Sequence, residues 1–189
     1  MYKYKVKKAV SSFVLCALIL SLCACGKENT DRAAVYEKTI GGLADDELFV
    51  LIDTNAPLPV LLVTSQVYDD GTGKQASISC DVYYPAGKEV KRIGTIESTG
   101  TAYPVSYDET GIYAASGHGM QRFEIEESGI LKPAEGIYEQ FDENGEAAYT
   151  RETEKGAETI SEEEYYTAYE KYSNAAVAGF SYGASDAFQ

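Results

Sequence analysis

The side chains in this sequence that are best suited to chemistry are a single histidine and a serine between glycines. His118 lies in Ser-Gly-His-Gly-Met, and Ser181 lies in Gly-Phe-Ser-Tyr-Gly. The spacing Gly-x-Ser-x-Gly is typical of a nucleophilic serine on a sharp strand-to-helix turn, with its histidine later in the sequence. Here the only histidine, His118, precedes Ser181. The pattern therefore predicts no catalytic serine, and we interpret His118 as a turn residue.

Asp53 and Asn55 are the next candidates, because carboxylate and amide oxygens between two apolar runs are possible calcium ligands. The stretch Phe49–Val63 resembles the strand–loop–strand unit of integrin-type FG-GAP repeats, in which an Asp-x-Asn or Asp-x-Asp loop binds calcium. The resemblance implies that Asp53 and Asn55 hold the first two ligand positions. Pro57 stands where a third acid is expected, and Val60 replaces the acid that closes the loop. We expect a degenerate loop, and no metal or cofactor.

Cys80 lies in a predicted strand in which Ile78, Cys80, Val82 and Tyr84 share one face. No basic residue adjoins it to activate the thiol, so we interpret Cys80 as a small buried hydrophobe. The 30 acidic residues form too many pairs to single out a catalytic one. We expect no catalytic residue. The alternative is a small extracytoplasmic hydrolase that uses His118 or paired carboxylates.

The charge is distributed unevenly along the chain. Residues 1–24 carry four lysines and no acid, within a total formal charge of −14. Residues 25–189 therefore hold 12 basic and 30 acidic side chains, a formal charge of −18. Such a surface repels phosphate backbones, and a hydrophobic content of 44% is too high for a wholly disordered chain. The composition predicts an ordered, acidic protein that does not bind nucleic acid.

The amino terminus has the layout of a secretory signal. Four lysines in MYKYKVKK precede the 16-residue apolar run AVSSFVLCALILSLCA. That run is short for a membrane-spanning helix, which needs about 20 residues. We expect residues 1–24 to be a signal peptide, with an uncleaved amino-terminal anchor as the alternative.

The end of this leader resembles the bacterial lipobox, which has a leucine three positions before the modified cysteine and a small residue just before it. In Leu22-Cys-Ala-Cys25-Gly, Cys25 fits this pattern, whereas Cys23 does not because Leu22 precedes it. The resemblance implies cleavage after Ala24 and transfer of diacylglycerol to the Cys25 thiol. We expect residues 25–30 to form a lipidated tether that holds the protein on the extracytoplasmic face of the cell membrane.

The rest of the chain reads as short strands between tight turns. Turns rich in Asp, Asn and Gly leave no room for crossover helices, so neighbouring strands should pair antiparallel. We predict a mainly β fold over residues 31–174, an antiparallel meander forming a sheet or a partly closed barrel or propeller-like arrangement, with α+β as the alternative. The predicted strands are Leu48–Ile52, Val60–Val63, Ala76–Tyr84, Arg92–Ile96, Gly111–Ala115, Gln121–Glu126, Gly136–Phe141 and Ala147–Arg151.

Two helices are predicted to accompany the strands. Asp31 precedes a short amino-terminal helix over residues 32–40, which Gly41-Gly42 ends. Ser161-Glu-Glu-Glu164 is a capping box that begins a carboxyl-terminal helix. Residues 175–189 show no periodicity, and we predict a flexible tail. The carboxyl-terminal helix has one apolar stripe that we expect to pack on the sheet, formed by Tyr165, Ala168, Tyr169 and Tyr172.

The order of these features looks like that of uncharacterised surface lipoproteins of clostridial-type Gram-positive bacteria. The likeness extends over residues 31–174, from the apolar strands through a Tyr- and Gly-rich meander to the Glu-Glu-Glu-Tyr helix. It implies a lipid-anchored or secreted domain. We expect a non-catalytic domain that binds an extracellular ligand or protein, and the sequence singles out no residue for that ligand.

The lipobox gives the first prediction. Cys25→Ser should move the protein out of the membrane fraction and abolish metabolic labelling with a fatty acid, because no other cysteine fits the box. Cys23→Ser is the matched control and should remain labelled. Labelling that persists in Cys25→Ser would contradict the assignment.

Overall fold

The computed structural model describes residues 32–182. The predicted signal peptide, Cys25, the tether, Asp31 and residues 183–189 of the predicted tail lie outside the described residues. The chain divides into two compact units between Val35 and Tyr36, and all strands and cores discussed below belong to the second unit.

The amino-terminal helix covers the predicted residues 32–40 but is less regular than predicted. Residues 32 and 33 are α-helical, a 3-10 turn, η1 (Ala34–Tyr36), interrupts the helix, and a single α-helical turn, α3 (Glu37–Ile40), completes it. The backbone N–H of Gly41 donates to the carbonyl of Glu37 at 2.9 Å, which ends the helix where the glycine pair predicted. The nine helical residues 32–40 are too few to be stable alone, so packing such as that of Tyr36 must help to hold this segment.

The first sheet has four antiparallel strands in the order β1-β2-β5-β6. The apolar runs pair in full register, from Leu48 opposite Thr64 to Ile52 opposite Val60. Gly87 has φ +71° in the turn between β5 and β6, a conformation that glycine adopts without strain. The strands are β1 (Leu48–Ile52), β2 (Val60–Thr64), β5 (Ser79–Ala86) and β6 (Glu89–Glu97).

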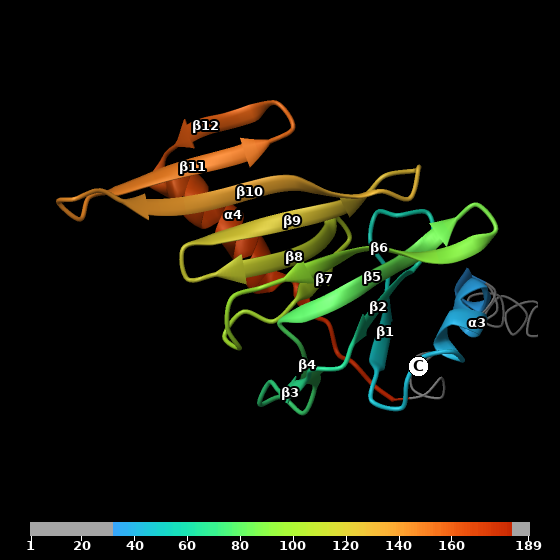
Figure 1. Ribbon diagram of the computed structural model, residues 1–189. Coiled ribbons are helices and arrows are strands. Elements are labelled where there is room, and N and C mark those ends of the chain that lie inside the picture. Colours follow the sequence, from blue (N-terminus) through green and yellow to red (C-terminus); the bar gives the residue numbers. More distant parts are fainter. Residues whose placement is uncertain (1–31, 183–189) are drawn as a thin grey trace, which may run out of the picture. The chain divides into compact units, whose positions relative to one another are not determined.

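The second sheet has seven antiparallel strands in the order β12-β11-β10-β9-β8-β7-β13, so consecutive strands are neighbours from β7 to β12 (Figure 1). Both sheets are open, and the predicted antiparallel meander is confirmed in its sheet form. The strands are β7 (Ser106–Asp108), β8 (Gly111–Ser116), β9 (Gly119–Ile125), β10 (Leu131–Phe141), β11 (Ala147–Thr153), β12 (Gly156–Ile160) and β13 (Ala176–Val177).

Several short strands were not predicted. β3 (Tyr68–Asp69) and β4 (Gln75–Ala76) form a two-stranded ribbon, and β7, β12 and β13 extend the seven-stranded sheet. The exposed residues of β12, Gly-Ala-Glu-Thr, lack the apolar alternation that indicates a strand. Backbone pairing with β11 holds β12 in place instead.

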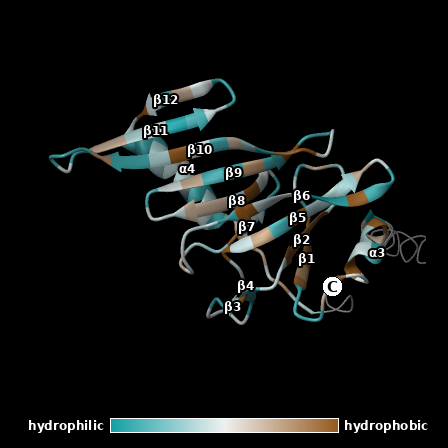
Figure 2. Cartoon of the chain, in the orientation of Figure 1, coloured by the Kyte–Doolittle hydropathy of each residue, from teal (hydrophilic) through white to brown (hydrophobic). Residues whose placement is uncertain are grey.

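Three apolar clusters hold the strands together. One lies between the two sheets and combines Leu62 and Val82 of the first sheet with Ile112 and Ile125 of the second. The opposite face of the four-stranded sheet packs Leu61 and its neighbours against Tyr36. Because β2 is buried on both faces, its residues Val60–Val63 are continuously apolar. Figure 2 shows β1 and β2 in the brown of hydrophobic residues, whereas β11 is largely in the teal of hydrophilic ones.

The carboxyl-terminal helix α4 (Glu162–Asn174) forms the third cluster on the other face of the seven-stranded sheet. The predicted capping box is present, since Glu164 N donates to Ser161 Oγ at 3.2 Å and Ser161 N donates to Glu164 Oε2 at 2.8 Å. The predicted stripe packs on the sheet, where Tyr165 and Tyr172 are buried and burial raises the pKa of Tyr165 to about 12. The Tyr169 hydroxyl donates to the carbonyl of Ser116 at 2.9 Å.

The prediction of a flexible tail from residue 175 is wrong for residues 175–182. Ala178 N donates to Val105 O, and Phe180 N donates to Gln75 O at 2.8 Å. Ser181 then pairs with Phe49 of β1. The Ala- and Gly-rich composition did not indicate an ordered segment, because small residues give no apolar pattern. Ala178 is nevertheless fully buried in the core.

Phe180 gives a test of this correction. Its side chain is 3% exposed within the cluster between the sheets, so Phe180→Ala should lower the free energy of unfolding by about 3–5 kcal/mol. Tyr182→Ala is the matched control, because that ring is 62% exposed and its loss should change stability by no more than about 0.5 kcal/mol. Urea denaturation measures both, and equal effects would contradict the ordered tail.

Candidate functional site

A charged surface lies beside α4 on the same face of the seven-stranded sheet. Met120 lies under the helix, and Arg122 and Glu124 follow it at two-residue spacing on β9. The same change from an apolar to a charged side chain occurs on β11, from Tyr149 to Arg151, and on β12, from Ile160 to Glu158. Each strand therefore passes from an apolar residue under α4 to charged residues beyond it.

A β-bulge in β10 brings two further charges to this face. Lys132 is opposite Glu124, and Glu135 is opposite Arg122, with the register shift between Pro133 and Glu135. In a regular strand, residues three apart point to opposite faces. The extra residue of the bulge shifts this alternation by one, so Lys132 and Glu135 point to the same face of the sheet. The bulge thus gathers an acid and a base that strict alternation would separate.

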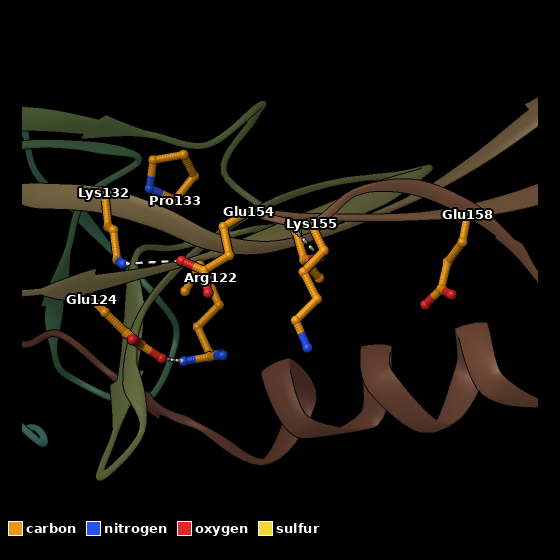
Figure 3. A pocket seen from close by; sticks show the side chains of 9 residues that line it. Arg122, Glu124, Lys132, Pro133, Glu154, Lys155 and Glu158 are labelled. Carbon is orange, nitrogen blue, oxygen red and sulfur yellow. Dashed lines mark hydrogen bonds and ion pairs between the residues drawn. The ribbon is translucent and has the colours of Figure 1, made fainter.

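The charged residues line a groove of about 500 Å³, which we call the charged groove (Figure 3). Three bases and three acids line it, so its formal charge is zero on a chain that is strongly acidic overall. In Figure 3 the Lys155 and Glu158 side chains extend from the β11–β12 hairpin on the side where α4 lies. The lining consists of Arg122, Glu124, Lys132, Pro133, Ala134, Thr153, Glu154, Lys155 and Glu158.

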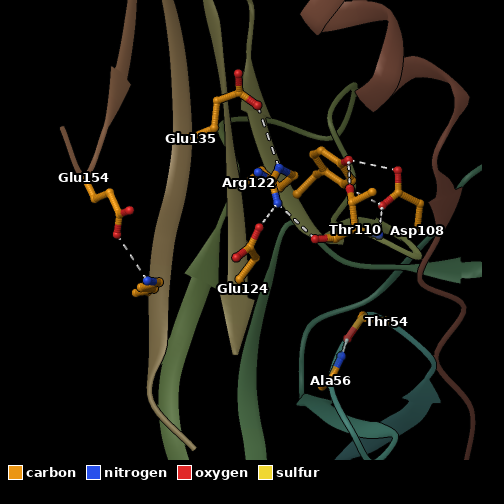
Figure 4. A network of polar contacts seen from close by, with 10 residues as sticks. Thr54, Ala56, Asp108, Thr110, Arg122, Glu124, Glu135 and Glu154 are labelled. Carbon is orange, nitrogen blue, oxygen red and sulfur yellow. Dashed lines mark hydrogen bonds and ion pairs between the residues drawn. The ribbon is translucent and has the colours of Figure 1, made fainter. Parts of the chain in front are cut away.

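Arg122 is held from three sides (Figure 4). Its guanidinium forms an ion pair with Glu124, donates to the carbonyl of Thr110 at 3.0 Å, and lies 3.8 Å from Glu135 Oε2. The Thr110 hydroxyl donates to Asp108 Oδ1 at 2.7 Å, and the Tyr113 hydroxyl donates to Asp108 Oδ2 at 2.9 Å. Burial opposes the charge on Asp108, but these hydrogen bonds outweigh it and lower its pKa. The network fixes Arg122 against the sheet.

The remaining ion pairs continue across the strands. Glu135 Oε1 lies 3.2 Å from Arg151 Nε, a contact without hydrogen-bond geometry, and Arg151 Nη1 lies 3.6 Å from Glu158 Oε1. Lys132 Nζ lies 3.0 Å from Glu126 Oε1 and 3.6 Å from a carboxylate of the β11–β12 turn, that of Glu154. The pKa of Lys132 is raised mainly by Glu126.

Lys155 differs from the other bases of the charged groove. In residues 32–182 its ammonium group forms no ion pair, whereas Arg122 and Lys132 each have carboxylate partners. An ammonium group at the open side of a groove is available to an external anion or dipole. Within residues 32–182, the charged groove therefore combines ion-paired charges with one exposed cation, Lys155, that forms no ion pair.

The side chains that line the charged groove are mainly charged ones. Among the described residues that line it there is no His, Cys, Ser or Tyr, and Thr153 carries the only hydroxyl group. Glu124 and Glu154 each face a cation, Arg122 and Lys132 respectively. The carboxylates of the charged groove are therefore mostly engaged in ion pairs with its own bases.

His118 lies in the turn between β8 and β9, as predicted, but it has a partner that the sequence did not reveal. Its Nδ1 lies 2.9 Å from Glu139 Oε2, and its ring meets Phe141 edge to face with centroids 5.5 Å apart. Glu139 comes from β10, 21 residues later. The histidine side chain is 65% exposed, whereas that of Glu139 is only 13% exposed, so the ring is open to water while its carboxylate partner is largely buried.

The loop of Asp53 and Asn55 does not gather ligands. Both residues are exposed between β1 and β2, and Thr54 Oγ1 accepts a hydrogen bond from Ala56 N at 3.2 Å. Across residues 32–182, no three side chains of His, Cys, Asp or Glu come together as a metal site.

Ser181 and Cys80 are both placed in structural surroundings. Ser181 exchanges two backbone hydrogen bonds with Phe49, at 3.0 and 3.1 Å, in extended pairing along the edge of β1. Gly183 of its motif lies outside the described residues. Cys80 is 2% exposed in the cluster between the sheets, which confirms the interpretation as a buried hydrophobe.

Comparisons with protein families, with curated proteins and with solved structures found no match for this chain. Within the part of the chain that the structure describes, no helix has the length and apolar content needed to cross a membrane.

The position of Cys80 gives a test of the core. Burial raises the pKa of its thiol to about 12, and thiolate is the reactive form. Ellman's reagent at mildly alkaline pH should therefore leave Cys80 unmodified in the folded protein and modify it after unfolding in urea. Cys80→Ala isolates its signal from those of the other cysteines. Rapid modification of Cys80 in the folded protein would contradict this placement.

Proposed function

We propose that the protein is a lipid-anchored lipoprotein of the extracytoplasmic surface, whose β-rich domain binds an external ligand or partner protein without catalysis. The lipobox at Cys25 supports the location. The observation that carries the binding role is the charged groove, which presents opposite charges on three strands of the seven-stranded sheet and on the β11–β12 turn. Complementary charge patterns provide specificity and rapid association.

The charges also define the kind of partner. With three bases and three acids the charged groove does not share the repulsion toward anions that the whole acidic surface exerts. It favours a partner that carries both signs of charge, such as a protein surface with alternating acidic and basic side chains. Nucleic acid remains a poor partner because it offers only one sign.

A second candidate function rests on the contact between His118 and Glu139. A carboxylate on one ring nitrogen orients a histidine, which is the arrangement that a general base requires. Against it, the His118 ring is open to water although Glu139 is largely buried, and Ser116, two residues before it, uses its hydroxyl to accept a hydrogen bond from the His118 backbone at 3.3 Å. We therefore rank the hydrolase below the binding domain.

Lys155→Glu tests the binding role. The tagged full chain is purified from detergent-solubilised envelopes, and components that accompany it are quantified. Because the reversal changes the charged groove from balanced to acidic without breaking an ion pair, we expect loss of its partner by about tenfold or more. Lys91→Glu, an identical charge change at an exposed site on β6, should retain it. A set of accompanying components that is the same in both variants would contradict the proposal.

His118→Ala in the same experiment separates the two functions. If the domain binds without catalysis, this variant retains its partner, and purified wild type shows no hydrolysis of ester, phosphoester or glycoside substrates above the level of His118→Ala. Hydrolysis that this substitution abolishes in a folded protein would support the hydrolase instead.

A further inference from the structure

A small hollow lies on the face of the seven-stranded sheet opposite α4. Ile137 and Met120 face the helix, so their strand neighbours Tyr138 and Gly119, which are paired in register, face the other way. The hollow has a volume of about 190 Å³ and is separate from the charged groove. Its lining includes Glu97, Thr99, Ala114, Ser116, Gln121 and Tyr138.

The Tyr138 ring lies against the backbone of the sheet because two glycines leave room for it. A Cβ atom on Gly136 would lie 2.6 Å from Tyr138 Oη, and one on Gly119 would lie 3.0 Å from Tyr138 Cδ1. Neither glycine has a positive φ, so neither is required by its own backbone conformation. Gly136 is thus explained by the ring that covers it, whereas a Cβ atom on Gly119 would also lie 2.6 Å from the backbone carbonyl oxygen of Ile137.

The ring is also fixed at its polar end. Gln121 Nε2 donates to the Tyr138 hydroxyl at 2.6 Å. In the described part of the chain no other aromatic ring contacts Tyr138, although tyrosines elsewhere pack on one another. A partly exposed ring that is held in place on one side leaves its other side to a ligand.

From this geometry we infer that the hollow binds a neutral sugar ring. A sugar ring has an apolar C–H face that stacks on an aromatic ring, and hydroxyl groups at its edge that need donors and acceptors. Tyr138 supplies the aromatic surface, whereas Glu97, Thr99 and Gln121 supply a carboxylate, a hydroxyl and an amide. The volume suits a single ring.

The charges of the hollow exclude other ligand classes. Its described lining contains Glu97 and no lysine or arginine, so an anion would find no cation to pair with. A quaternary ammonium ion is the competing ligand, because a tyrosine face and a carboxylate both attract cations. Such ions are best held by several rings around them, and Tyr138 is the only aromatic residue that lines the hollow among the described residues.

The experiment titrates the full lipidated chain, in a detergent without sugar groups, with glucose, galactose, mannose and N-acetylglucosamine. Saturation-transfer NMR detects the bound sugar and gives its dissociation constant. We expect saturable binding of at least one sugar, weakened about tenfold or more in Tyr138→Ala. Tyr182→Ala, which removes an exposed tyrosine that does not line the hollow, should bind as the wild type does.

Gly136→Ala keeps the inference testable if Tyr138→Ala does not fold. This substitution retains every lining side chain and displaces only the end of the Tyr138 ring, so it should weaken sugar binding to a similar extent. The inference is overturned if no sugar saturates, if both variants bind as the wild type does, or if tetramethylammonium binds in place of the sugars.

This sugar site deepens the proposed binding role but lies on another surface. Failure of all sugars to bind, with partner capture still dependent on Lys155, would remove the sugar site alone. Sugar binding without any such capture would instead leave the hollow as the binding surface and remove the role of the charged groove.

Discussion

Alternation of side chains along the strands of the seven-stranded sheet is the constraint on which the rest of the structure depends. Ile112 and Ala114 contribute to the core between the sheets, whereas Tyr113 and Ala115, one residue along, contribute to the core under α4. A shift of one residue in register would exchange the two sets and leave both cores unfilled. The register of β8 with its neighbours is therefore fixed by packing on both faces at once.

This constraint also determines where binding surfaces can form. The four-stranded sheet covers only part of one face of the seven-stranded sheet, and α4 covers only part of the other. Beyond these covered areas the side chains still alternate between the faces, but they are polar. On one face the uncovered positions are Arg122, Glu124 and their partners across β10 to β12. On the other face they are Gln121 and Tyr138. Both surfaces thus have rigid supports, because the same strands continue into packed cores.

The sequence predicted the parts of the fold that follow from local patterns. Continuous apolar runs identified β1 and β2, and the capping box at Ser161 identified the start of α4. It did not predict β12, whose residues are polar and small, nor the placement of Phe180, which depends on contacts with distant residues. Pairing energy and long-range packing decide such segments, and neither appears in a local window.

The binding surfaces were harder to predict for the same reason. The charges of the charged groove meet only after a bulge brings Lys132 and Glu135 to one face, and a bulge breaks the two-residue period that sequence reasoning relies on. Glu139 reaches His118 across a strand pair. The two-residue spacing of Met120, Arg122 and Glu124 is visible in the sequence. Only the position of α4 shows that Met120 is covered by the helix and that Arg122 and Glu124 line the groove beside it.

The carboxyl-terminal segment shows how a sequence without periodicity can still be specified. Val177 pairs with Ser106 of the seven-stranded sheet, and Ser181 pairs with Phe49 of the four-stranded sheet. The segment therefore joins both sheets, and its backbone hydrogen bonds go to residues far apart in the sequence, among them Val105, Gln75 and Phe49. A chain that crosses from one sheet to another has no single face to bury, so no regular period is expected of it. Its small residues allow the close approach, and Phe180 supplies the apolar contact that holds it.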